Sequence, residues 1–371
     1  MHSLHALPAL LLSILVSGCA TTHRDHLASA SVDETLKLLA ERHNVCGVAL
    51  AVIRNRSLES IRFASGCTPA TTPGPDSIFQ AASLSKPVFA YAVMRLAAQG
   101  KLDLDAPVMD YLPQGYRHRS NPLQAEPSEL VTDARLRAVT ARMVLNHTSG
   151  LPNWFSGRLS VHSTPGTKWN YSGEAYVLLQ RAVETITKQT LDQFARSEVF
   201  KPLAMAHSDY TWNDEIARRL LPGAKANGAP RATFDLRTPV AAFSLYTSAA
   251  DYGKFMAALL GDSAAIAQVT ASPVTVDARL GLSWGLGWGI ERAVDDSYIW
   301  QWGNNPGYRA FAIASVRSGD GFVMLTNSEN GLELAKPLAE KILPGDHKLF
   351  HSTLLGWDPL NLICNAVRIC L

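Results

Sequence analysis

Ser83 and Lys86 are the first residues whose types and spacing suggest chemistry, in the stretch Ala82-Ser83-Leu84-Ser85-Lys86-Pro87. On a helix, residues three apart share a face, so the amine can reach the hydroxyl. Serine becomes a good nucleophile when a base takes its proton. Lysine can be that base if burial and neighbouring positive charge lower its pKa. The alternative is a chance match, with Ser83 as a helix cap and Lys86 as a solvated side chain.

Tyr171 is a second candidate, in the loop 165–173 that precedes a predicted helix. A phenol placed beside Ser83 and Lys86 could shuttle protons, and positive neighbours would lower the pKa of a tyrosinate. The alternative is a tyrosine packed on the surface of a helical lobe. We interpret Glu174, which opens the predicted helix, as an acidic residue in a favourable position at the positive end of the helix dipole. A catalytic role for Glu174 is the alternative.

A third candidate stretch covers residues 300–308, between two predicted strands. The main-chain N–H groups of Asn304 and Ser83 could form an oxyanion hole for an acyl-transfer intermediate. Glycine here would allow a close approach of the backbone to a substrate. A tight turn that needs glycine and proline is the alternative.

Hydrophobic periodicity predicts the elements that must position these residues. The predicted helices are 31–43, one from Ser83 to about Gln99, 139–146, 174–187, 191–199, 249–260 and 331–343. The predicted strands are 47–53, 58–64, 288–292, 298–301, 308–316 and 321–325. Short connections between the late strands imply an antiparallel sheet. We predict an α+β fold, with N- and C-terminal helices flanking this sheet and an all-helical lobe inserted at about 103–275.

Composition excludes several classes of function. The 371 residues are 47% hydrophobic and 18% charged, with a formal net charge of +2 and dispersed charges. Nothing therefore indicates a nucleic-acid partner. The histidines and cysteines lack metal-ligand spacing, and no phosphate-binding glycine loop is present, so we expect no metal and no cofactor.

The N-terminus predicts export. Residues 7–16 form an apolar run of signal-peptide length, too short to span a membrane. The following stretch Val16-Ser17-Gly18-Cys19 resembles a bacterial lipobox, although no lysine or arginine precedes the run. We therefore expect a lipoprotein signal peptide at 1–18, lipidation of Cys19, a tether at 19–30 and attachment to the periplasmic side of a membrane. The alternative is an ordinary cleaved signal.

The other four cysteines suggest disulfides, as expected in an exported protein. Cys46 opens one predicted strand and Cys67 follows the next, so the two ends of that hairpin are neighbours and we expect a Cys46–Cys67 bridge. Cys364 and Cys370 are the remaining pair, in a C-terminal tail at 346–371 whose apolar residues could pack onto the domain or onto a partner.

Taken together, Ser83-x-x-Lys86, Tyr171-Ser172-Gly173 and Gln301-Trp302-Gly303 resemble the serine β-lactamase and penicillin-binding-protein superfamily. The resemblance is to the class C-like branch, which includes D,D-peptidases, D-aminopeptidases and carboxylesterases. Supporting stretches are Leu102-Asp103-Leu104-Asp105, Tyr111-Leu112-Pro113, His147-Thr148-Ser149-Gly150-Leu151-Pro152, Pro202-Leu203-Ala204-Met205 and Asn327-Ser328-Glu329-Asn330-Gly331. The hydrolase domain is expected at 31–345.

The resemblance implies roles by position. Ser83 would be acylated, Lys86 and Tyr171 would activate it and move protons, and the N–H groups of Ser83 and Asn304 would hold the oxyanion. The substrate-binding positions would be Ser83, Asn304, Gln301, Trp302, Gly303 and Gly173.

Two positions depart from the family's pattern. Gly173 replaces an asparagine whose amide would contact the acyl side chain. Gln301 replaces a lysine or histidine that helps to bind the carboxylate of a β-lactam or peptide, and a neutral group binds an anion more weakly. Arg309 lies close in sequence and could supply that charge.

These observations lead to a hypothesis of an exported serine hydrolase that cleaves an amide, either a β-lactam or a D-amino-acid peptide, through an acyl-enzyme on Ser83. A carboxylesterase on the same fold is the first alternative, since related esterases tolerate changes at both departing motifs. A lipid-anchored module that binds cell wall without catalysis is the second.

Overall fold

The computed structural model describes residues 29–68, 72–232 and 234–355. Its helices are α2 (Val32–Arg42), α3 (Ser85–Ala98), α4 (Ala141–Leu145), α5 (Gly173–Thr187), α6 (Leu191–Ala195), α7 (Asp214–Arg219), α8 (Ala249–Gly261), α9 (Ser263–Thr270) and α10 (Ala335–Ile342). Its strands are β1 (Val48–Arg54), β2 (Ser57–Ala64), β3 (Phe79–Gln80), β4 (Arg117–His118), β5 (Glu129–Leu130), β6 (Tyr246–Thr247), β7 (Val274–Asp277), β8 (Leu282–Trp284), β9 (Gly289–Arg292), β10 (Ser297–Asn305), β11 (Tyr308–Ser315) and β12 (Gly321–Thr326).

An eight-stranded antiparallel sheet forms the centre, in the order β2-β1-β12-β11-β10-β9-β8-β7. The hairpin β1–β2 turns at Asn55 and Arg56, both with positive φ, as a tight hairpin requires. Strand β1 then pairs with β12, so that Val48 lies opposite Thr326 and the first and last strands are neighbours. The α+β class and the antiparallel pairing of the late strands are confirmed.

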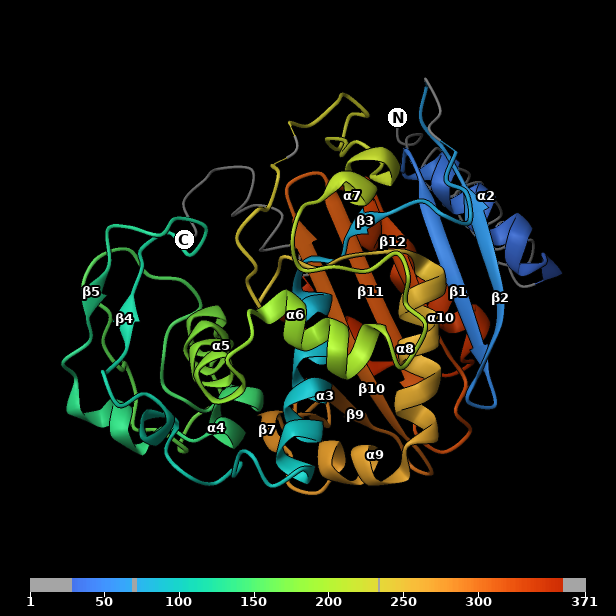
Figure 1. The fold of residues 1–371 in the computed structure, drawn as a ribbon. Coiled ribbons are helices and arrows are strands. Elements are labelled where there is room, and N and C mark those ends of the chain that lie inside the picture. Colours follow the sequence, from blue (N-terminus) through green and yellow to red (C-terminus); the bar gives the residue numbers. More distant parts are fainter. Residues whose placement is uncertain (1–28, 69–71, 233, 356–371) are drawn as a thin grey trace, which may run out of the picture.

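Alternation along β1 gives the sheet two buried faces. Val48, Leu50 and Val52 pack in the cluster that contains α2 and α10, as predicted for terminal helices. The intervening Ala49 and Ala51 face the cluster that contains α3 and α8. Helix α8 therefore lies on the sheet (Figure 1), although the predicted helical lobe included it. The residues around α4, α5, β4 and β5 form the lobe, to the left of α3 in Figure 1. The lobe is not all-helical as predicted, because β4 and β5 pair within it.

Local sequence accounts for the N-terminal helix. Ser31 caps α2 by accepting from the N–H of Glu34, whose carboxylate accepts in return from the Ser31 N–H at 2.7 Å. Such a capping box satisfies donors that the first helical turn cannot pair. Beyond β2, the predicted Cys46–Cys67 disulfide is confirmed, with the two Cα atoms 4.6 Å apart.

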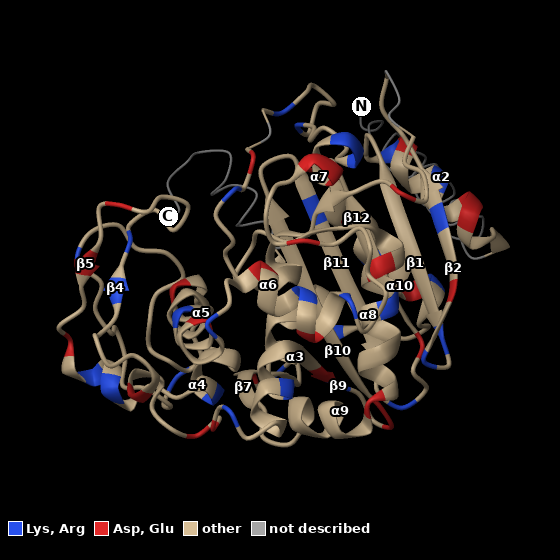
Figure 2. Ribbon diagram, viewed as in Figure 1, with Lys and Arg blue, Asp and Glu red and all other residues tan. Residues whose placement is uncertain are grey.

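Part of the C-terminal tail packs onto the domain. Leu349, Phe350 and Leu355 are buried in the cluster that holds α2 and α10. The expected signal peptide, Cys19, and the Cys364 and Cys370 pair lie outside the described residues. Among the described helices, none has both the length and the apolar character needed to cross a bilayer. Charged residues of both signs are scattered over the ribbon (Figure 2).

We expect the Cys46–Cys67 bridge to stabilise the domain, because it closes a loop with a sequence separation of 21. Restricting the unfolded chain in this way contributes about 3 kcal/mol. The double variant Cys46→Ala/Cys67→Ala should lose about this much unfolding free energy in urea titrations. Wild-type protein in reducing agent is the matched control, and an unchanged unfolding midpoint in both samples would contradict the prediction.

Candidate active site

Ser83 lies in a short 3₁₀ turn, Ala82–Leu84, directly before α3 and not within the helix as predicted. The turn forms because Ala82 has φ +49°, a left-handed conformation that alanine adopts only when the surroundings impose it. Ser85 provides that constraint. Its hydroxyl donates to the Ala82 carbonyl at 2.5 Å and accepts from the N–H of Leu245 at 3.0 Å.

Two buried tyrosines hold the carbonyl groups that follow Ser83. Tyr252, on α8, donates to the Leu84 carbonyl at 3.0 Å, and Tyr210 donates to the Ser85 carbonyl at 2.6 Å. The position of Ser83 therefore depends on packing from distant parts of the chain as well as on the local turn.

Lys86 points from the first turn of α3 to Ser83. Its Nζ lies 3.2 Å from the Ser83 hydroxyl and donates to the Ala242 carbonyl at 2.8 Å. The side chain is only 1% exposed, and this burial lowers the pKa of Lys86 to about 7. A neutral amine is thus well populated at neutral pH, as a general base requires.

Tyr171 is held in place by its two neighbours in sequence. Asn170 binds the 147–152 loop through its N–H, which donates to the His147 carbonyl, and through its amide, which donates to the Leu151 carbonyl. The Ser172 N–H donates to His147 Nδ1 at 3.1 Å, and the Ser172 hydroxyl caps α5. The stretch 147–152 thus supports the loop that carries Tyr171.

The Tyr171 phenol lies beside Lys86, whose Nζ is 4.7 Å from the ring centroid. Burial raises the pKa of Tyr171, and the nearby Ser83 and Gln301 side chains only partly oppose this. The predicted lowering of its pKa is therefore wrong, because desolvation outweighs the neighbouring groups. Tyr171 is a neutral phenol at neutral pH, and the Ser83 and Gln301 side chains lie beside its hydroxyl.

His147 packs against Tyr171, with ring centroids 4.3 Å apart. Burial and the charge of Lys86 hold the pKa of His147 well below its usual value. Because Nδ1 accepts a hydrogen bond, the neutral ring carries its proton on Nε2. His147 therefore contributes an uncharged aromatic ring that packs against Tyr171.

The stretch Gln301-Trp302-Gly303 lies on β10. It follows Trp300, the last residue that pairs with β9, so one edge of the strand is open there. The Trp302 N–H points to this edge, where it donates to the Gln301 side-chain oxygen at 3.0 Å. Alternation then directs the Asn304 N–H to the same edge. Gly303 permits the close approach of the Ser83 turn, since a Cβ there would lie 2.5 Å from the Ala81 carbonyl oxygen.

A cavity of about 750 Å³ joins these groups. Ser83, Lys86, Tyr171, Trp302 and Asn304 line it, as the sequence predicts. It is also lined by Ser120, Asn121, Pro122, Leu123, Asn153, Trp154, Phe243 and Asn305, which sequence reasoning missed. Asn153 and Trp154 directly follow the His147-to-Pro152 stretch, which is the one signal that pointed to them.

Three predicted substrate-binding residues lie behind this lining. Gln301 and Gly303 are buried on β10, with Gly303 against the turn that carries Ser83, and Trp154 covers Gly173. Arg309 does not provide the missing charge, because its guanidinium donates to the carbonyls of Asn305 and Tyr308.

Glu174 has a structural position outside the lining. Its carboxylate is buried, lies 3.3 Å from His118 and accepts from the Phe155 N–H at 3.0 Å. It therefore joins the 118 and 155 segments to the start of α5, and burial raises its pKa.

Comparison with known proteins agrees with this geometry. The sequence model of the beta-lactamase family matches residues 32–346. The chain belongs to the beta-lactamase family. It is accordingly a beta-lactamase-family serine hydrolase, and its relatives include a penicillin-binding protein and an esterase.

Individual relatives of this beta-lactamase-family chain differ in activity. Penicillin-binding protein 4 of Amycolatopsis lactamdurans is 32% identical over 206 residues, which cover 50% of this chain and 50% of that protein. Esterase EstB of Burkholderia gladioli is 32% identical over 200 residues, 45% of this chain and 47% of that protein. The chain thus spans about half the length of these two curated relatives.

A solved structure shows the same fold. The D-alanine carboxypeptidase AmpC from Burkholderia cenocepacia has a TM-score of 0.67 and 18% identity, covering 87% of this chain and 99% of that chain.

The lowered pKa of Lys86 predicts the pH dependence of this family member. If neutral Lys86 is the base, kcat/KM for an uncharged activated ester should rise tenfold per pH unit below about 7 and level off above it. The profile is measured from pH 5 to 9 at the isosbestic wavelength of nitrophenol. Lys86→Met is the control and should be inactive throughout. Activity that still rises at pH 9 without a plateau would contradict the assignment of the base.

Proposed function

We propose that this beta-lactamase-family protein hydrolyses uncharged carboxylic esters through an acyl-enzyme on Ser83. The observation that carries the proposal is the charge of the cavity. Among the described residues that line it, Lys86 alone has a side chain that can be cationic, and its pKa of about 7 leaves the amine largely neutral at slightly alkaline pH.

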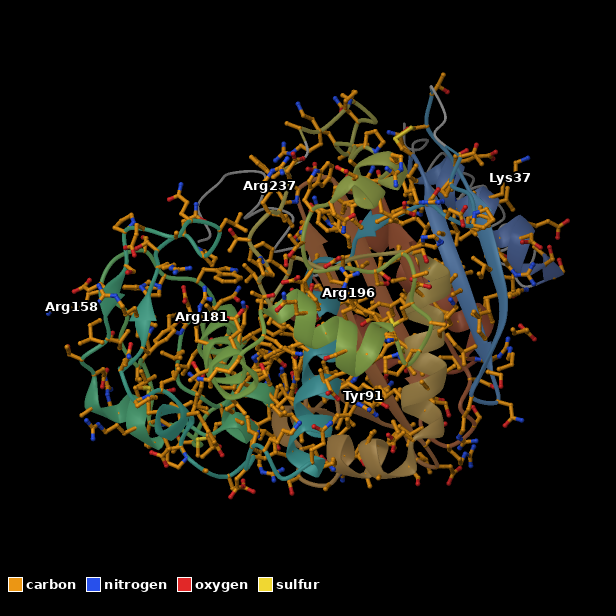
Figure 3. The ribbon with its side chains drawn as sticks, in the orientation of Figure 1. Lys37, Tyr91, Arg158, Arg181, Arg196 and Arg237 are labelled. Carbon is orange, nitrogen blue, oxygen red and sulfur yellow. A yellow bond between two sulfur atoms is a disulfide. The ribbon has the colours of Figure 1, made fainter. Side chains whose placement is uncertain are left out.

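Two arginines on the elements that carry the motifs are engaged with other protein groups. Arg309 is bound to backbone carbonyls, and Arg181 of α5, labelled in Figure 3, pairs with Glu184 at 2.7 Å. A substrate carboxylate would therefore lose water in the cavity without gaining a charge-assisted hydrogen bond. An ester that carries no charge avoids this cost.

The proposed reaction starts when neutral Lys86 takes the proton from the Ser83 hydroxyl as Oγ attacks the carbonyl carbon. The N–H groups of Ser83 and Asn304 stabilise the oxyanion that forms. When the carbon–oxygen bond to the leaving group breaks, the proton passes from Lys86 to the departing alcohol, with the Tyr171 phenol as relay. Water then attacks the acyl carbon and gives one proton to Lys86. Lys86 passes this proton to Ser83 Oγ as the acyl–Oγ bond breaks, so that the acid is released and both residues return to their starting forms.

Cleavage of D-amino-acid peptides or β-lactams is the second candidate. The side-chain amides of Asn121, Asn153 and Asn304 line the cavity and could bind a peptide. The relatives with penicillin-binding or carboxypeptidase names support this possibility. A non-catalytic binding module is disfavoured, because such a module gains nothing from a buried lysine in contact with a serine.

We also propose that the protein is exported, with Cys19 lipidated and anchored at a membrane surface. The apolar run at 7–16 and the lipobox-like stretch support the anchor. The Cys46–Cys67 disulfide is consistent with an oxidising compartment.

Ser83→Ala should reduce hydrolysis of p-nitrophenyl butyrate by about 10⁴-fold or more, because the nucleophile is lost. The wild-type protein should hydrolyse this ester with a kcat/KM at least about tenfold above that for nitrocefin or a D-Ala-D-Ala peptide, since each lost charge-assisted bond costs about 1.5–3 kcal/mol. Intact-mass spectra should show a butyryl adduct that the variant lacks. Higher kcat/KM for nitrocefin or the peptide would favour the second candidate, and full activity of Ser83→Ala would refute both.

A further inference from the structure

Trp154 occupies the space that the missing side chain at position 173 leaves open. A Cβ on Gly173 would lie 2.5, 2.6 and 2.8 Å from three atoms of the indole ring, closer than real contacts allow. Any side chain at position 173 would therefore have to displace this ring. The indole ring therefore occupies the place where the side chain of the family's asparagine would begin.

Phe243 completes an aromatic corner with Trp154. The two ring centroids are 5.5 Å apart and the planes meet at 82°, which is the edge-to-face geometry that aromatic pairs prefer. Both rings line the cavity that contains Ser83, together with the apolar Leu123 and Pro122. Trp154 is nevertheless 42% exposed, so part of the indole ring is left uncovered by protein.

The backbone on both sides of Trp154 is fixed to the start of α5. The N–H groups of Gly173 and Glu174 each donate to the Asn153 carbonyl at 3.0 Å, and the Gly173 N–H also contacts the Asn153 side-chain oxygen. On the other side, the Phe155 N–H donates to the Glu174 carboxylate. The ring is thus preorganised, and a ligand that packs on it orders few additional groups.

We propose that Trp154 and Phe243 form an acyl subsite that selects flat apolar acyl groups, such as arylacetyl groups, over small ones. This inference rests on the proposed acylation of Ser83 and adds the class of acyl group. An indole face and a phenyl edge can pack against an aromatic ring of the substrate, whereas an amide at position 173 would favour a polar acyl side chain. Trp154 is therefore a specificity-determining residue in this proposal.

Two uncharged phosphonate esters test the subsite without requiring turnover: ethyl p-nitrophenyl methylphosphonate and ethyl p-nitrophenyl benzylphosphonate. In each, Ser83 Oγ forms a bond to phosphorus, p-nitrophenolate leaves, and Lys86 takes the serine proton. The substituent on phosphorus then occupies the place of the acyl group. We expect the benzyl compound to inactivate the wild-type protein faster than the methyl compound, and Trp154→Ala to reduce this ratio of rate constants about tenfold.

Trp154→Phe is the matched control and should retain most of the ratio, because a ring remains. An unchanged ratio in Trp154→Ala would overturn the acyl subsite. Equal loss of both rates in that variant would overturn it as well, because the indole would then be only structural. If neither compound modifies Ser83, the proposed function fails, and with it the inference. If both compounds react but the wild-type ratio is near one, only the inference fails.

A stability measurement tests the overlap of the two positions independently of activity. Gly173→Ala should lower the melting temperature of the wild-type protein, because the new Cβ meets the indole ring. In the Trp154→Ala background the same change should raise it, because alanine favours the helix that begins at this residue. The opposite signs are the expected result, since residues in contact are not additive. Equal shifts in both backgrounds would show that the ring does not occupy this space.

Discussion

An amine buried beside Ser83 connects the active site to the packing around it, because two protein oxygens replace most of the water that would solvate a lysine. These are the Ser83 hydroxyl and the Ala242 carbonyl. Burial alone lowers the pKa of Lys86 to about 7, and any movement that admitted water would raise it again. The basicity of Lys86 therefore depends on the aromatic residues that enclose it, including Tyr171 and Tyr176, whose rings lie within 6 Å of Nζ. The contacts that pack the site therefore also determine the pKa of Lys86.

The start of α5 carries much of that packing. Within four residues, Tyr171 reaches the amine, Ser172 binds His147 and caps the helix, Gly173 leaves room for Trp154, and Glu174 binds both His118 and the Phe155 N–H. These contacts join Lys86 of α3, the stretch from His147 to Phe155, and His118 to the start of α5. The cavity wall from 120 to 123 continues directly from His118, so the buried Glu174 carboxylate helps to set the shape of the cavity without touching it. Glu174 therefore has a structural role that does not depend on a part in catalysis.

The parts of the fold that the sequence predicted are those with a strong period. The β1–β2 hairpin, α2, α5 and the late strands follow from alternation, caps and turn residues. The short strands β7 and β8 were missed, since three or four residues give no period, and α8 was placed in the lobe because an apolar helix does not reveal which surface it covers. The catalytic motifs were recognisable as patterns. Trp154 and Phe243 were not, because their contact joins residues 89 positions apart and depends on a side chain that Gly173 lacks. The pKa of Tyr171 was predicted in the wrong direction because burial depends on tertiary packing.

The neutral Gln301 relates the proton chemistry to the charge of the substrate. A lysine or protonated histidine at this position, beside Tyr171, would favour the tyrosinate and disfavour the protonated form of Lys86. With a neutral amide there, burial keeps Tyr171 a phenol and alone sets the pKa of Lys86, so the base and the proton relay are assigned to different residues. The same substitution removes the cation that would offset the desolvation of a substrate carboxylate. A site built in this way is suited to substrates that bring no charge, and the aromatic surface of Trp154 offers such substrates a place to pack.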